Sequence, residues 1–130
     1  MSGADETVVP EDLGYTAEHE WARGGEVLTV GITEFAVSAL GDVVYLELPP
    51  PGTAVHEGER CGEVESTKSV SDLYSPASGT VVEVNAAVIE RPELLNQEPY
   101  GRGWLFAVRV AEPPTLLSPA RYREICEGQG

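Results

Sequence analysis

The chain has 130 residues, of which 42% are hydrophobic, and this size and composition fit one globular domain. Its 22 acidic residues and 8 lysines and arginines give a net charge of −14, which repels a phosphate backbone and argues against nucleic-acid binding. Its apolar runs are all shorter than the roughly 18 residues of a transmembrane helix, so we expect no membrane span.

The first twelve residues are acidic and polar, and they match neither a secretory signal nor an organellar transit peptide. We expect residues 1–12 to be a flexible acidic tail on a cytoplasmic protein and residues 13–130 to form the domain. Cys61 and Cys126 are far apart, and His19 and His56 lack ligand spacing, so neither a disulfide framework nor a metal site is expected.

Short valine-rich segments between glycine and proline turns predict a mainly β fold. Two segments of the form Gly-x-Val-Val, beginning at Gly41 and Gly79, suggest two similar halves and hence a small sandwich or flattened barrel. The expected strands are 26–32, 43–48, a short one within 53–60, 61–66, 70–74, 80–85 and 104–110.

Capping residues predict the helices. Thr33 is a good N-cap, and Gly41 is placed to end a helix over Glu34–Leu40. A helical turn is expected at 92–96, with proline at its first position. Ser118 caps a final helix that begins at Pro119 and presents one apolar face, made of Tyr122, Ile125 and Cys126.

Lys68 is predicted to lie at the tip of a β-hairpin formed by 61–66 and 70–74. The tip lacks the Asn-Gly pair typical of a type I′ turn, so a type I turn or a longer loop is expected. The neighbouring acids Glu65 and Asp72 favour the ammonium form, which disfavours a Schiff-base nucleophile. From these residues alone, an ordinary exposed lysine is the preferred interpretation, and a modification site is the alternative.

Several sequence blocks in a fixed order shift the preference from an ordinary exposed lysine to a modification site. They are Tyr-Thr-Ala-Glu-His-Glu-Trp at 15–21, and the segments 30–33, 40–49, 65–72, 76–85 and 99–105. Over these blocks, and so over nearly the whole chain, the sequence resembles the glycine cleavage H-protein family. The resemblance implies a barrel-sandwich hybrid of two small antiparallel sheets with short flanking helices. Residues 13–130 would then be a lipoyl-carrier domain with a C-terminal helix.

The resemblance also implies a non-catalytic, monomeric carrier with lipoate attached to Lys68. The carrier would take an aminomethyl group from glycine decarboxylase, the P protein, to a tetrahydrofolate-dependent aminomethyltransferase, the T protein. Dihydrolipoyl dehydrogenase, the L protein, would then reoxidise it. A lipoate ligase or octanoyltransferase would recognise Glu65, Ser66 and Asp72, and Glu20 and Asp72 would hold the protonated amine in a cleft.

Three alternatives remain from the sequence. One is another lipoyl or biotinyl carrier, although Thr67 and Ser69 stand where biotinyl carriers usually have methionine. A second is a lipoate-relay protein, and a third is an unmodified acidic binding module. The loop 86–91 is less acidic than is usual in the family, a departure that bears on partner contacts.

Overall fold

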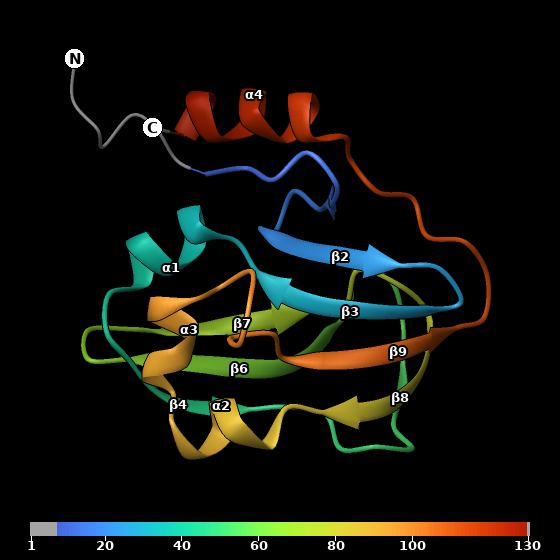
Figure 1. The fold of residues 1–130 in the computed structure, drawn as a ribbon, viewed down its shortest axis with the longest axis horizontal. Coiled ribbons are helices and arrows are strands. Elements are labelled where there is room, and N and C mark those ends of the chain that lie inside the picture. Colours follow the sequence, from blue (N-terminus) through green and yellow to red (C-terminus); the bar gives the residue numbers. More distant parts are fainter. Residues whose placement is uncertain (1–7, 130) are drawn as a thin grey trace.

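Two antiparallel sheets enclose one core in the computed structural model, which describes residues 8–129 (Figure 1). The larger sheet has the strand order β1 (Gly14–Tyr15), β2 (Glu20–Gly24), β3 (Val27–Ile32), β9 (Phe106–Val110), β8 (Gly79–Val84) and β5 (Ala54–Val55). The smaller sheet has the order β4 (Val43–Glu47), β6 (Arg60–Ser66) and β7 (Val70–Tyr74). This arrangement confirms the predicted mainly β, barrel-sandwich fold.

The core forms because alternate strand residues from both sheets point inward. Val30 and Phe106 from the larger sheet, and Val64 and Leu73 from the smaller one, belong to one buried apolar cluster. A second cluster, around Tyr15, Trp21 and Tyr122, lies beneath the C-terminal helix. The fold therefore has a main core between the sheets and an aromatic core under that helix.

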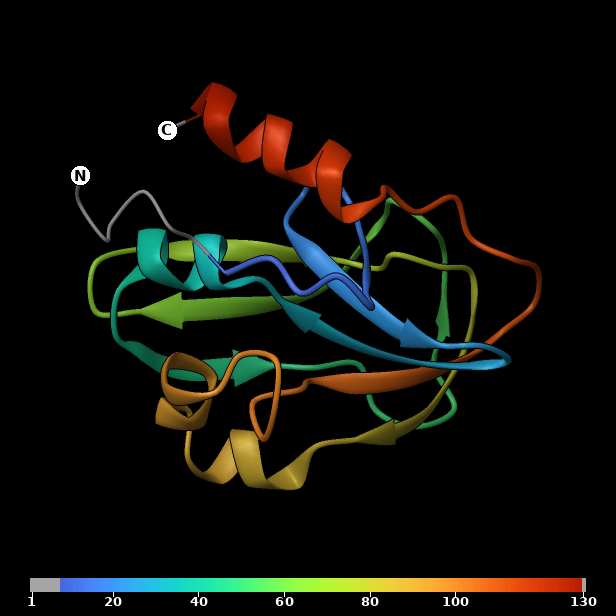
Figure 2. The same ribbon diagram turned by 45° about the horizontal axis from the view of Figure 1, so that its top comes forward.

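Among residues 8–129, four short helices connect or cover the sheets: α1 (Glu34–Leu40), α2 (Ala86–Glu90), α3 (Glu93–Gln97) and α4 (Pro119–Gln129). Thr33 caps α1 by accepting a hydrogen bond from the backbone N–H of Ala36 at 3.3 Å. Gly41, with φ of +84°, ends α1 in a conformation that favours glycine. Figure 2 shows α4 lying across the fold near β2.

The predicted bounds of α1 and β7 agree with the structure, and the other predicted strands differ from it by only one or two residues at their ends. The strands β1 and β2 and the helix α2 were not predicted. In α4, Tyr122 and Cys126 are buried as expected, whereas Ile125 is only half-buried.

The described part of the expected tail is packed rather than free. Val9 is buried, and its carbonyl accepts a hydrogen bond from Arg123 on α4 at 3.1 Å. The Val8 N–H donates to the carboxylate of Glu34 on α1 at 2.8 Å, so residues 8–12 run between these helices (Figure 1). The prediction of a flexible tail is therefore wrong for residues 8–12. Residues 1–7 lie outside the described residues, and the prediction stays a prediction there.

Within residues 8–129, no helix combines the length and apolar character that a membrane crossing requires.

Candidate functional site

Lys68 is exposed in the turn that joins β6 to β7. The hydroxyl of Ser66 accepts hydrogen bonds from the backbone N–H groups of Lys68 and Ser69, at 3.3 and 3.1 Å. Thr67 and Lys68 do not have the positive φ angles of a type I′ turn, since His19 is the only non-glycine residue with positive φ among those described. The turn prediction is thus confirmed, and a buried serine side chain shapes the turn from within.

A second set of hydrogen bonds ties this turn to the rest of the fold. The Thr67 N–H donates to the carbonyl of Asp42 at 3.0 Å. On either side of Asp42, the side chain of Asn96 accepts from the Val43 N–H at 2.9 Å and donates to the Gly41 carbonyl at 2.8 Å. Because Asn96 lies on α3, this helix holds the segment on which the lysine turn rests.

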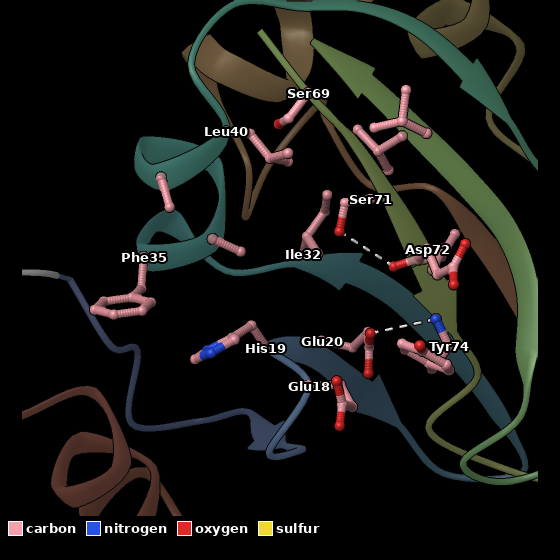
Figure 3. Close-up of a pocket in the computed structure, with 15 residues that line it drawn as sticks. Glu18, His19, Glu20, Ile32, Phe35, Leu40, Ser69, Ser71, Asp72 and Tyr74 are labelled. Carbon is pink, nitrogen blue, oxygen red and sulfur yellow. Dashed lines mark hydrogen bonds between the residues drawn. The ribbon is translucent and has the colours of Figure 1, made fainter. Parts of the chain in front are cut away.

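A cleft of about 580 Å³ begins beside this turn and runs between α1 and β7 (Figure 3). Ser69 and Leu40 line the end next to the lysine, and His19, Glu20 and Tyr74 line the opposite end. Its walls include eight apolar residues: Ile32, Phe35, Ala36, Ala39, Leu40, Val64, Val70 and Leu73. The cleft therefore has a mixed lining, with the polar residues Ser69, Ser71 and Asp72 on the β7 side and the ionisable residues Glu18, His19 and Glu20 at the end far from the lysine.

Glu20 is the main ionisable group at that far end. It is only 2% exposed, and burial raises its pKa from 4.5 to about 7, against the opposing effect of its hydrogen bonds. The Thr16 hydroxyl donates to one carboxyl oxygen at 2.6 Å, and the Tyr74 N–H donates to the other at 3.3 Å. A cation entering the cleft would stabilise the charged form of this carboxylate.

Asp72 lines the same cleft in a different environment. Its side chain is 47% exposed, and it accepts a hydrogen bond from Nε of Arg60 at 3.0 Å. Arg60 also pairs with Glu63, which lies opposite Asp72 in the β6–β7 ladder. Asp72 is thus a screened surface acid, whereas Glu20 is a desolvated one.

The remaining predicted recognition residues flank the turn. Glu65 is half-buried on β6, between Tyr45 of β4 and Val70 of β7 in the sheet register. Ser66 is buried, so its side chain supports the turn rather than facing outward.

Sequence reasoning missed three residues of this region: His19, Asn96 and Tyr122. The imidazole of His19 lines the cleft, stacks on Phe35 with ring centroids 4.9 Å apart, and lies 2.7 Å from the Tyr122 hydroxyl. These contacts join positions up to 103 residues apart, so no local pattern would reveal them. The one local signal was a histidine directly before the buried Glu20.

The comparisons with known proteins agree with this geometry. A sequence profile described as glycine cleavage H-protein matches residues 13–128. The glycine cleavage system H protein of Thermobifida fusca is 57% identical over 124 residues, which cover 94% of this chain and 98% of that protein. The H protein of Streptomyces avermitilis is 59% identical over 118 residues, with 88% and 94% covered.

A solved structure gives the same result. The crystal structure of a glycine cleavage system H protein from Mycobacterium marinum matches with a TM-score of 0.85 and 46% identity, covering 89% of this chain and 97% of that one. Profile, sequence and fold thus agree over most of the described residues. The chain therefore belongs to the glycine cleavage H-protein family, the carrier proteins of the glycine cleavage system, as the sequence resemblance predicted.

Proposed function

We propose that Lys68 carries a lipoyl group in amide linkage and that the chain acts as a non-catalytic carrier. The observation that supports this best is the position of an exposed lysine at one end of a cleft with eight apolar wall residues, whose other end holds a buried carboxylate. Lys68 is also the only lysine in the sequence, because the other seven basic residues are arginines. A modifying enzyme would therefore find a single side-chain amine to acylate.

The residues around Lys68 fit a long apolar arm. A Cβ atom at Gly41 would lie 3.4 Å from Cε of Lys68, so the glycine leaves room for the lysine stem beside the end of α1. Four residues of a strand, as between Val70 and Tyr74 along the cleft, span about 13 Å. An extended chain advances roughly 1.2 Å per bond, so the roughly eleven bonds from a lysine Cα to the lipoyl ring also reach about 13 Å.

When bound, the lipoyl group would supply a disulfide that accepts the aminomethyl group derived from glycine. The protein's own contribution would come from Glu20, and from Asp72 at the edge of the cleft. A carboxylate beside the amine keeps it protonated through a charge-assisted hydrogen bond. Protonation occupies the nitrogen lone pair that would otherwise expel the neighbouring sulfur. The apolar walls would limit the access of water to the same group.

Membership of the glycine cleavage system implies partners that load, unload and reoxidise the carrier. We assign these roles to glycine decarboxylase, the aminomethyltransferase and dihydrolipoyl dehydrogenase. A lipoate ligase or octanoyltransferase would act on the Lys68 turn and read Glu65 and Asp72, with Ser66 fixing the shape of the turn. Cytoplasmic location and the monomeric state stay predictions of the sequence.

Intact mass measured after coexpression with a lipoate ligase tests the attachment. The wild-type chain should gain one lipoyl group, and Lys68→Arg should gain none. Because no other lysine exists, a lipoyl group on the Lys68→Arg protein would have to lie on the N-terminal amine. That result would contradict attachment at Lys68. An unmodified wild-type chain would contradict the carrier role and favour an unmodified binding module.

A further inference from the structure

The hydroxyl of Tyr122 joins three segments that are distant in sequence. It lies 2.7 Å from Nδ1 of His19, in the turn before β2, and 2.6 Å from the hydroxyl of Thr33, at the start of α1. Tyr122 itself lies on α4 and is fully buried, with its ring stacked on Tyr15 at a centroid distance of 4.6 Å. One buried phenol therefore connects α4 to both the turn and the helix.

Both connected segments contribute walls to the cleft. His19 and Glu20 line its far end, and α1 provides Phe35 and Ala36. Neither Tyr122 nor Thr33 belongs to the lining, so Tyr122 contacts the anchors of the walls without facing the cleft. The backbone strengthens the same junction, since the Thr33 N–H donates to the His19 carbonyl at 3.0 Å.

The contacts of His19 hold its backbone in an uncommon conformation. His19 has φ of +72°, a left-handed conformation that few non-glycine residues adopt. Its ring is held from one side by Tyr122 and packs on Phe35 of α1 on another. The strained backbone thus places an aromatic ring between the turn that carries Glu20 and the helix wall.

We infer that Tyr122 is a positioning residue of the cleft: its hydroxyl fixes the His19 ring and the start of α1, and so sets the width of the cleft beside Glu20. The inference rests on the proposed function, because the cleft matters only if it shelters the loaded arm. In this arrangement the C-terminal helix acts on the bound group through His19 and Thr33. Without the hydroxyl, the two walls would be joined only by the Thr33–His19 backbone hydrogen bond and the stacking of His19 on Phe35, and we expect water to reach the far end more often.

The hydrogen bonds also have a preferred direction. The Ala36 N–H donates to the Thr33 oxygen at 3.3 Å, which leaves the Thr33 proton free to point to Tyr122. In this direction Tyr122 donates its proton to Nδ1 of His19 rather than to the neighbouring Cys126, and the Thr33 and Tyr122 protons each have an acceptor. Burial raises the pKa of Tyr122, so the phenol keeps this proton at neutral pH. This direction predicts that Nδ1 of His19 carries no proton.

Tyr122→Phe tests the inference, with Tyr15→Phe as a matched control. Both variants keep the stacked rings and lose one hydroxyl, but the Tyr15 hydroxyl donates to the Pro10 carbonyl at 2.7 Å, on the side of the N-terminal segment. The lipoylated proteins are loaded with the aminomethyl group, separated from the enzymes, and followed for its spontaneous loss. We expect loss to be roughly three- to tenfold faster in Tyr122→Phe, as for the loss of one hydrogen bond, and unchanged in Tyr15→Phe.

The unmodified proteins give a second measurement that needs no lipoyl group. In the wild type, ¹⁵N NMR should show an unprotonated Nδ1 on His19 that accepts a hydrogen bond, and Tyr122→Phe should shift this signal and speed amide exchange at Ala36. His19→Asn, which tolerates the left-handed backbone, should lose the aminomethyl group as fast as Tyr122→Phe, and the double variant no faster.

The outcomes separate the inference from the proposed function. Equal rates of loss in Tyr122→Phe and Tyr15→Phe, or an unchanged His19 signal, would overturn the role of Tyr122 alone. If the wild-type protein lost its aminomethyl group as fast as a small aminomethylated dihydrolipoamide, the shelter itself would be refuted, and the inference with it.

Discussion

Replacing Glu20 with glutamine tests whether the far end of the cleft is as desolvated as the structure indicates. The carboxyl is 2% exposed and its pKa is raised from 4.5 to about 7. Between these pH values the folded protein holds a proton on Glu20 that the unfolded chain has released. Raising the pH therefore favours the unfolded state, and this part of the stability is complete below about pH 4.5 and lost as the pH rises through about 7.

The magnitude follows from the two pKa values. At roughly 1.4 kcal/mol per pKa unit, the wild-type fold loses about 3 kcal/mol through Glu20 between acid and neutral pH. Glutamine does not titrate, so the Glu20→Gln protein should gain this amount relative to the wild type as the pH rises. Its amide can still accept from Thr16 but loses an acceptor for the Tyr74 N–H, which lowers its stability by about 1 kcal/mol at every pH.

Urea unfolding at pH 5, 6, 7 and 8 measures the difference in free energy of unfolding between Glu20→Gln and the wild type. The contributions of the other acids are the same in both proteins and cancel in this difference. Glu18→Gln is the matched control, because it removes an exposed carboxylate two residues away in the same turn. We expect the control to follow the wild type within about 0.5 kcal/mol. A constant difference between Glu20→Gln and wild type across this range would show that Glu20 titrates normally and would refute the desolvation argument.

Three further changes test other parts of the site. Asp72→Ala should shorten the lifetime of the aminomethylated arm. It should lower the free energy of unfolding by less than about 1 kcal/mol, because the ion pair of Asp72 with Arg60 is exposed. An unchanged lifetime would show that Asp72 does not hold the arm. Asn96→Ala should lower the free energy of unfolding by about 1–3 kcal/mol and raise the KM of lipoylation, measured with a purified ligase. An unchanged KM would argue against the role of Asn96 in supporting the lysine turn. Gly31→Ala should lower the urea midpoint by an amount equivalent to about 1–3 kcal/mol, because its Cβ would lie 2.5 Å from the Trp21 indole; an unchanged midpoint would contradict this close packing.

Local signals explain which elements could be predicted. The helix α1 carries its own N-cap, Thr33, and its own terminating glycine, Gly41, so its bounds were found from sequence. The strand β2 was missed because Glu20, its first residue, is a buried acid where a strand pattern would place an apolar residue. The helix α2 has a single buried residue, Val88, and is too short to show a periodic pattern.

The residues of the candidate site also divide into those that the sequence could predict and those that it could not. The exposed hairpin position of Lys68 follows from neighbouring strands, and the resemblance supplied its chemical role. Glu20 is buried only in the folded chain, where its carboxyl also accepts from the Tyr74 N–H, 54 residues away, so its raised pKa could not be read from its neighbours in sequence. Tyr122 was predicted only as part of an apolar face, because its hydroxyl meets His19 and Thr33 only in the folded chain.

Two adjacent residues at the far end of the cleft each destabilise the fold. Glu20 is a buried acid that costs stability at neutral pH, and His19 has a left-handed backbone where glycine would be relaxed. Glycine at position 19 would relax the backbone but lose the ring contacts with Phe35 and Tyr122. An apolar residue at position 20 would avoid burying an acid but leave the Tyr74 N–H without its acceptor. Both side chains face the end of a cleft that starts at the only lysine, and a cation held there would offset the desolvation of Glu20. These features support the proposal that the far end of the cleft receives a positively charged group carried on a long arm.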